Sequence, residues 1–295
     1  MKVLRRGDVT DLLSIQDAIP LMRAAFEALA NDAVSMPPRV FVKADRLGGS
    51  IAFMSAFVDP LDAMGMKAIA LYADNPAKRS LPAILGSMLL FAADSGRTLA
   101  LMDAGPITAI RTAAVSALAT DLLARDDARV AGFIGTGVQA RAHVLALREV
   151  RPIRRIVAFS RTPSKTKDFA HWVSDSFGLE AQALPDPQAV VKESDILTTA
   201  TPSQTPIVEG AWIPVGSHLN VIGSGLAMEV DSTAYARASK IVVDQRDSAM
   251  SEAQDLWGAI LAGSLKPEGI YGELGDLILK RKPGRETADE ITSFR

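Results

Sequence analysis

The chain contains 295 residues, and 48% of them are hydrophobic, which is enough for two domain cores of ordinary size. Its 32 Lys and Arg residues nearly balance 34 Asp and Glu residues, and the net charge of −2 argues against a general attraction to nucleic acid or to an anionic membrane. The chain has no cysteine, which excludes disulfides, thiolate nucleophiles and zinc–thiolate sites, and its charged first residues and lack of a long apolar run predict a soluble cytoplasmic protein.

The first part of the chain combines helical and extended patterns. Residues 17–29 have apolar positions at helical spacing and begin with Asp17, which can cap a helix. Short apolar runs separated by turn sequences predict a sheet over residues 39–71, and the turn sequence DSGR predicts a hairpin within residues 85–102. The Ala-rich residues 111–124 predict a helix, and we expect a domain junction there.

From residue 129 onward, apolar runs of strand length alternate with longer helical patterns. The clearest helices are expected at Val138–Val150 and Pro163–Phe177, and the expected strands are RVAGFI, RIVAF, DILTTA, HLNVI and KIVV. Regular alternation of strand and helix is typical of βαβ units. The pattern therefore predicts a parallel sheet that is covered on both faces.

A glycine-rich turn separates the first of these strands from its helix. In the sequence GTGVQA, Gly135 permits a tight turn, Gly137 lets the backbone approach a pyrophosphate, and Ala140 keeps the helix close to the strand. Together with Val138 and Gln139, these residues predict a dinucleotide-binding site at the helix N-terminus. The alternative is an ordinary tight turn between a strand and a helix.

The end of the second strand bears on the choice of cofactor. An NAD-selective site would place an Asp or Glu there to accept from the ribose 2′-hydroxyl, but this sequence offers Ser160, Arg161, Thr162 and Lys165. A guanidinium and hydroxyl groups suit a 2′-phosphate better than a bare hydroxyl. We expect NADP, with NAD also acceptable if Arg161 lies on a solvated loop.

Several stretches resemble the ornithine cyclodeaminase and mu-crystallin family. They are MDAGPITAIRTAAVSALATDLLAR with the following IGTGVQARAH, and the shorter MPPR, GMKAI, ILTTATPSQTPIV and DEIT. The resemblance implies an α/β protein with a Rossmann-type parallel-sheet domain and an α+β domain for substrate binding and dimerisation. We expect the substrate domain at residues 1–115, joined by the C-terminal residues, and the NAD(P)-binding domain at residues 116–285. A homodimer is expected from the resemblance alone.

The resemblance also points to three cations, Arg39, Lys67 and Arg111, as the residues that hold the substrate carboxylate. Charge-assisted donors suit a carboxylate, and a guanidinium supplies them in bidentate form. Lys67 interrupts an apolar strand pattern, where an unpaired ammonium would be costly, whereas each arginine alone could be a surface charge. Lys67 is therefore also the expected catalytic residue.

Two loops complete the expected cofactor site. Ala200, Thr201 and Pro202 follow the strand DILTT, and the resemblance places them under the nicotinamide half of the cofactor, although an ordinary Pro-terminated loop is the alternative. Gly223 and Ser224 follow the strand HLNVI and are expected to contact the cofactor. Ornithine cyclodeaminases carry a catalytic aspartate in a Gly-Gly-Asp motif at this point, where this chain has Gly-Ser-Gly.

The absent aspartate counts against a cyclodeaminase. Hydride addition to C=N needs a protonated iminium but no activated water. The loss of the aspartate therefore harms a reductase less than the other enzymes. We expect an NAD(P)H-dependent reductase of a small cyclic or linear ketimine acid, such as pyrroline- or piperideine-2-carboxylate. The alternatives are an ornithine cyclodeaminase, an alanine-type dehydrogenase, or a non-catalytic NADPH-binding protein like mu-crystallin. The scattered histidines (His143, His171 and His218) predict no metal site.

Overall fold

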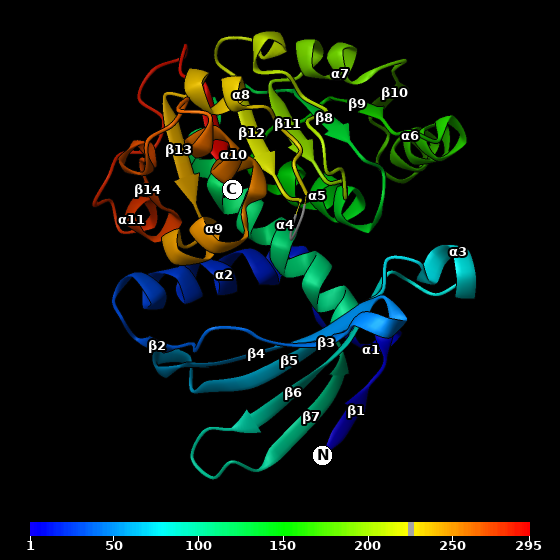
Figure 1. The fold of residues 1–295 in the computed structure, drawn as a ribbon, viewed down its shortest axis with the longest axis vertical. Coiled ribbons are helices and arrows are strands. Elements are labelled where there is room, and N and C mark those ends of the chain that lie inside the picture. The colour runs from blue at the N-terminus through cyan, green and yellow to red at the C-terminus, as the bar shows by residue number, and fades with distance from the viewer. Residues whose placement is uncertain (224–226) are drawn as a thin grey trace. The chain divides into compact units, whose positions relative to one another are not determined.

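The chain folds into two compact units, Met1–Arg111 and Thr112–Arg295, and the computed structural model describes residues 1–223 and 227–295 (Figure 1). The expected fold class is correct, because the first unit mixes helices with a mainly antiparallel sheet and the second has a Rossmann-type parallel sheet. The boundary between the units falls after Arg111, inside the helix α4 (Ala104–Leu123), whereas the sequence analysis placed a junction within residues 111–124 and the domain limit at residue 115. Among the described residues, no helix is both long enough and apolar enough to cross a membrane.

The first unit is built on a seven-stranded sheet with the order β1-β7-β6-β5-β4-β2, in which β3 also pairs with β4. Only the pair β1·β7 is parallel. The strands are β1 (Lys2–Leu4), β2 (Val34–Ser35), β3 (Val40–Ala44), β4 (Gly49–Val58), β5 (Ala63–Leu71), β6 (Ile84–Ala92) and β7 (Thr98–Asp103). The helices are α1 (Arg6–Leu12), α2 (Ile15–Ala30) and α3 (Asn75–Arg79), and α2 packs against β4 (Figure 1).

One face of this sheet exposes a row of apolar side chains. The register pairs Val42 with Ile51, Ile51 with Ala70, and Ala70 with Leu85, so the four residues cross β3, β4, β5 and β6 on the same face. Val42 is 57% exposed, Ile51 37% and Leu85 39%. An apolar row of this kind on a sheet face is typical of a surface that another protein chain covers.

The second unit contains an eight-stranded parallel sheet within its described residues, with the order β10-β9-β8-β11-β12-β15-β13-β14. The strands are β8 (Val130–Ile134), β9 (Arg155–Phe159), β10 (Glu180–Ala183), β11 (Ile196–Thr199), β12 (His218–Val221), β13 (Lys240–Val243), β14 (Gly272–Glu273) and β15 (Thr292–Phe294). The helices after α4 are α5 (Val138–Val150), α6 (Pro163–Phe177), α7 (Pro187–Glu193), α8 (Ser232–Arg237), α9 (Arg246–Glu252), α10 (Gln254–Leu261) and α11 (Leu274–Ile278).

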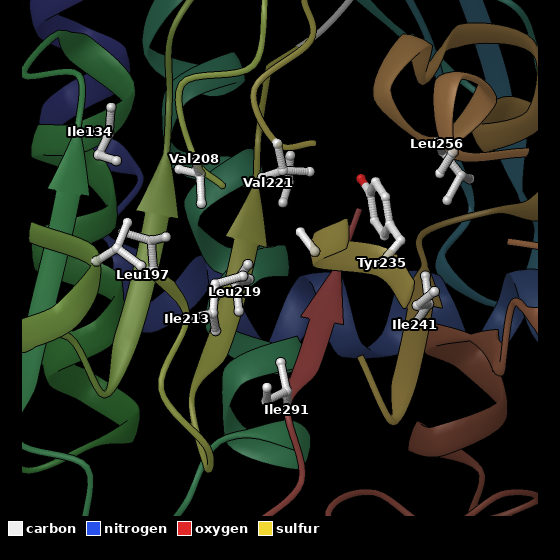
Figure 2. Close-up of a cluster of buried hydrophobic side chains, with 14 of the residues drawn as sticks. Ile134, Leu197, Val208, Ile213, Leu219, Val221, Tyr235, Ile241, Leu256 and Ile291 are labelled. Atoms are coloured by element: carbon white, nitrogen blue, oxygen red, sulfur yellow. The ribbon is translucent and has the colours of Figure 1, made fainter. Parts of the chain in front are cut away.

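Two apolar clusters cover the two faces of the parallel sheet. Successive strand residues point to opposite faces, so Ile196 joins the cluster under α5 and α6, and Leu197 joins the cluster under α7, α8 and α10. Figure 2 shows the cluster that contains Leu197, in which Leu219 of β12, Ile241 of β13, Tyr235 of α8 and Leu256 of α10 also take part. These cores fix the strands whose carboxyl ends carry the candidate site.

The C-terminal residues belong to the second unit, which corrects the expectation that they join the first. Strand β15 lies between β12 and β13 and pairs with both in parallel. The residues of this strand are buried, and the guanidinium of Arg295 forms an ion pair of 2.9 Å with the buried Asp255. Backbone pairing on both sides holds this segment in the parallel sheet.

Candidate functional site

A pocket of about 300 Å³ lies where the carboxyl ends of β8, β9 and β11 meet. Three loops that are far apart in the sequence form its lining, and each follows one of these strands. Of the residues that the sequence predicts for the cofactor, the lining includes Gly135, Gly137, Ser160, Arg161, Thr162, Lys165, Ala200, Thr201 and Pro202. The carboxyl edge of a parallel sheet is where ligands of such folds bind.

The glycine-rich turn between β8 and α5 has the geometry that a pyrophosphate needs. Gly135 has a φ of +97°, and a Cβ there would lie 2.5 Å from the carbonyl oxygen of Ala200, so only glycine fits. Gly137 caps the N-terminus of α5, and a Cβ there would meet no atom within 4 Å. Glycine at position 137 therefore keeps space open in front of the helix N-terminus, where backbone N–H groups point outward.

The loop after β9 brings positive charge to the pocket. Arg161 and Lys165 line the pocket and are exposed, while the hydroxyl of Ser160 donates to the carbonyl of Thr162 at 3.1 Å. Among the described lining residues there is no Asp or Glu. This loop can therefore accept an added negative charge but offers no carboxylate to a ribose hydroxyl.

The loop after β11 is held by a buried carboxylate that the sequence analysis missed. Glu229 is fully buried, and its two oxygens accept from the N–H and the hydroxyl of Thr201, the hydroxyl of Thr199 and the N–H of Gly223. Burial raises the pKa of Glu229, and the hydrogen bonds from Thr201, Thr199 and Gly223 oppose that rise. The sequence contained one signal for it, since a single charge interrupts the apolar run around Met228 and Val230.

Three other predicted cofactor residues, Val138, Gln139 and Gly223, are not among the residues that line the pocket. Val138 is exposed in the first turn of α5, and the backbone carbonyl of Gln139 lies 2.8 Å from the Nδ1 of His143. Gly223 is buried and donates its N–H to Glu229 at 2.6 Å. Ser224 lies outside the described residues.

A separate cationic cluster, formed by Arg39, Lys67 and Arg111, belongs to the first unit. Lys67 lies in the middle of β5, directly opposite Met54 of β4 and Met88 of β6, and all three side chains share one face of the sheet. Burial and the neighbouring guanidinium groups of Arg111 and Arg39 lower the pKa of Lys67 from 10.5 to about 8. The three predicted substrate residues thus lie close enough for their charges to interact. Both charged groups that lower the pKa of Lys67, those of Arg111 and Arg39, are cations.

Two of the three histidines, His143 and His218, have hydrogen-bond partners in the second unit. His143 is buried and its Nε2 lies 2.9 Å from the hydroxyl of Ser116, while the Nδ1 of His218 lies 2.9 Å from the hydroxyl of Thr292. Burial lowers the pKa of His143 to about 4 and that of His218 to about 3, so both rings are neutral near pH 7. Within residues 1–223 and 227–295, no three His, Asp or Glu side chains gather closely enough to hold a metal ion.

The profile of the ornithine cyclodeaminase/mu-crystallin family matches residues 1–295 of the chain. The chain belongs to this family. A solved structure of the Δ1-pyrroline-2-carboxylate reductase of Thermococcus litoralis, in complex with NADH and L-proline, is 35% identical and superimposes with a TM-score of 0.96, covering 100% of this chain and 91% of that one.

Two further relatives are a reductase and a dehydrogenase. The Δ1-pyrroline-2-carboxylate reductase of Bacillus cereus is 31% identical over 100% of this chain and 91% of its own length. A solved dimer of an archaeal alanine dehydrogenase with bound NAD is 32% identical, with a TM-score of 0.92, and covers 100% of this chain and 89% of that one.

Asp231 is the nearest aspartate in the sequence after the position where cyclodeaminases of this family carry their catalytic one. In the structure it is the N-cap of α8, and its side chain accepts from the N–H groups of Ala234 at 2.9 Å and Gly210 at 2.8 Å. The capping bonds commit this carboxylate to holding the start of a helix. The structure thus gives Asp231 a capping role at the start of α8.

Proposed function

We propose that the protein is an NAD(P)H-dependent reductase that converts a small cyclic or linear ketimine acid, such as pyrroline- or piperideine-2-carboxylate, into the amino acid. The observation that carries this proposal is the half-buried ammonium of Lys67, whose pKa is lowered to about 8 beside two guanidinium groups. Such a group can bind a carboxylate and still release a proton near neutral pH. The similarity to two Δ1-pyrroline-2-carboxylate reductases supports the same substrate class.

The chemistry divides between positioning and proton transfer. A bound nicotinamide cofactor supplies the hydride that adds to the carbon of the C=N bond. Arg39 and Arg111 orient the substrate carboxylate through charge-assisted hydrogen bonds. Lys67 keeps the imine nitrogen protonated, so that this nitrogen takes up the electron pair of the C=N bond when the hydride adds.

The function is tested by following cofactor oxidation and ammonia release together. We expect clear NADPH or NADH consumption with proline-ring and piperidine-ring imines and with ketimines formed from pyruvate and amines, and no ammonia from ornithine. Robust proline and ammonia formation from ornithine would identify a cyclodeaminase. Reversible oxidation of alanine would identify a dehydrogenase, and a shift in NADPH fluorescence without consumption would identify a binding protein.

We further propose that NADP is the preferred cofactor, with NAD accepted. The support is the loop after β9, where Arg161 and Lys165 line the pocket and no carboxylate does so among the described residues. The related reductase of Thermococcus litoralis holds NADH, and the related archaeal alanine dehydrogenase holds NAD. The proposed preference for NADP therefore rests on this chain's own residues.

The Arg161→Ala variant tests this preference. It should weaken NADPH binding by roughly tenfold to a hundredfold, because a charge-assisted contact to a phosphate contributes about 1.5–3 kcal/mol. NADH binding should change little. The matched control is Lys167→Ala, which removes an exposed cation of α6 outside the pocket lining and should affect neither cofactor. Equal losses for NADPH and NADH in titrations of Arg161→Ala would contradict the assignment.

The exposed apolar row of the first unit supports a homodimer. We propose that Val42, Ile51 and Leu85 form part of the surface that a second copy covers. The related archaeal alanine dehydrogenase is a dimer. Light scattering after gel filtration measures the mass in solution, and a monomer at micromolar concentration would contradict this proposal.

A further inference from the structure

The side chain of Glu229 connects two loops that begin at neighbouring strands of the parallel sheet. One oxygen accepts from the N–H of Thr201 at 2.6 Å and from its hydroxyl at 2.8 Å. The other accepts from the hydroxyl of Thr199 at 2.8 Å and from the N–H of Gly223 at 2.6 Å. The carboxylate therefore ties the end of β11 to Gly223, just after the end of β12, and it accepts from four donors at once.

The backbone around Glu229 holds the same loop at its far end. The N–H groups of Ile207 and Val208 donate to the carbonyl of Glu229 at 3.0 and 3.1 Å, and the N–H of Met228 donates to the carbonyl of Ser203 at 2.6 Å. Thr201, Ser203 and Ile207 all line the pocket. One short segment thus fixes the pocket wall after β11 at several points along its length.

The fixed wall also contacts the glycine-rich turn. Ala200 donates its N–H to the carbonyl of Ile134 at 2.9 Å, and the carbonyl oxygen of Ala200 lies within 2.5 Å of the place where Gly135 would carry a Cβ. The methyl group of Thr201 lies 3.1 Å from the same place. The pocket wall after β11 therefore packs directly against the outer side of the turn at Gly135.

We propose that Glu229 is a positioning residue that sets the pocket wall at Ala200–Pro202 for the nicotinamide half of the cofactor. This inference rests on the proposed cofactor site. A dinucleotide crosses such a sheet at its switch point, with its adenosine half toward the second strand and its nicotinamide half toward the strands on the other side. In this chain those strands are β11 and β12, whose ends Glu229 joins.

The donors around Glu229 make a carboxylate necessary. Of its four bonds, two come from backbone N–H groups, which can only donate, and two come from hydroxyls, which can reverse their role. A glutamine has the same shape, but its amide nitrogen must face either Thr201 or Gly223. One buried N–H then loses its acceptor, and the loop it belongs to must move.

The test compares whole cofactor with a fragment that lacks nicotinamide. In Glu229→Gln we expect NADPH to bind at least ~10-fold more weakly, on the scale of one lost charge-assisted hydrogen bond. The affinity for 2′-phospho-ADP-ribose should stay within about twofold of the wild type, because the adenosine half lies beside other loops. NADH and ADP-ribose form a second pair with the same expectation.

The matched control is Asp195→Asn, at the opposite end of β11. Asp195 also accepts from two backbone N–H groups, those of Arg129 at 2.8 Å and Val130 at 2.9 Å, but it precedes the strand and does not line the pocket. Asp195→Asn should lower the unfolding temperature. It should change the affinities for NADPH and for 2′-phospho-ADP-ribose by the same factor. Glu229→Asp, which keeps the charge on a shorter side chain, should restore part of the NADPH affinity.

The outcomes separate this inference from the proposed function. A selective loss of NADPH affinity in Glu229→Gln, partly restored in Glu229→Asp, supports the positioning role. Equal losses for NADPH and the fragment, matched by Asp195→Asn, overturn it and leave the cofactor site standing. If Glu229→Gln does not fold, Thr199→Val removes one donor at a buried position outside the pocket lining, and a lack of any selective loss there overturns the role as well. A wild-type protein that binds neither ligand overturns the cofactor site itself.

Discussion

Replacing Lys67 by alanine should reduce the rate of imine reduction by at least ~10²-fold, the usual scale for loss of a positioned proton donor. The pKa of this ammonium is lowered to about 8, so it is charged at neutral pH and still a usable acid. Lys67→Arg should restore the rate only partly, because a guanidinium returns the charge but is a poor acid. Steady-state kinetics with a cyclic imino acid measure both effects.

The pH profile and a surface control complete the test of Lys67. If the protonated amine is the active form, kcat/KM should fall as the pH rises through about 8, and Lys67→Arg should remove that fall. Lys43→Ala removes an exposed cation from the same sheet and should leave the rate unchanged. A Lys67→Ala enzyme with wild-type turnover would show that another group supplies the proton.

Replacing Gly137 by valine should weaken binding of NADPH and NADH by at least ~10²-fold, about 3 kcal/mol, while the protein stays folded. A side chain there enters the space in front of α5 but meets no protein atom within 4 Å of its Cβ, and the φ of −82° suits any residue. Isothermal titration measures the affinity, and circular dichroism measures the fold.

The control for Gly137→Val is Gly7→Val in the first unit, where an added Cβ also meets nothing within 4 Å. It should leave cofactor affinity unchanged. Wild-type affinity in a folded Gly137→Val protein would mean that the pyrophosphate does not lie at the N-terminus of α5.

The regular elements of the second unit could be predicted from the sequence because their signals are local. The bounds of α5 and α6 agree with the prediction, since a glycine-rich turn precedes one and Pro163 and Gly178 bracket the other. Helix α2 was predicted less well, because Ser14 caps it and Asp17 instead accepts a bond from that serine. Local chemistry permits either residue as the cap, and only the observed backbone distinguishes them.

The elements that the sequence did not reveal depend on distant partners. Strand β15 is short and contains Thr292 and Ser293. Its sequence therefore has too few apolar residues to predict a buried strand. A junction was expected within the Ala-rich residues 111–124, but the composition of this helix does not change at Arg111, so the sequence did not show where in the helix the boundary falls. In both cases the deciding interaction is pairing or packing with residues far away in the chain.

The candidate site also has a part that could be predicted from local sequence and a part that depends on residues far apart in the chain. The pocket-lining loops could be predicted because they come directly after strands of a parallel sheet, where ligands bind. Glu229 could not, because its importance lies in the donors that surround it, which come from Thr199, Thr201 and Gly223. A buried charge within an apolar run shows that a partner is needed but does not show which one.

The position of β15 also affects how the second unit acquires its structure. Strands β12 and β13 come earlier in the chain but do not pair with each other, because β15 lies between them. Until residues 292–294 are in place, the parallel sheet consists of two separate parts, each with an open strand edge that can join another chain. Removing these three residues would thus divide the sheet rather than trim it, and would leave newly made protein prone to aggregation at both edges.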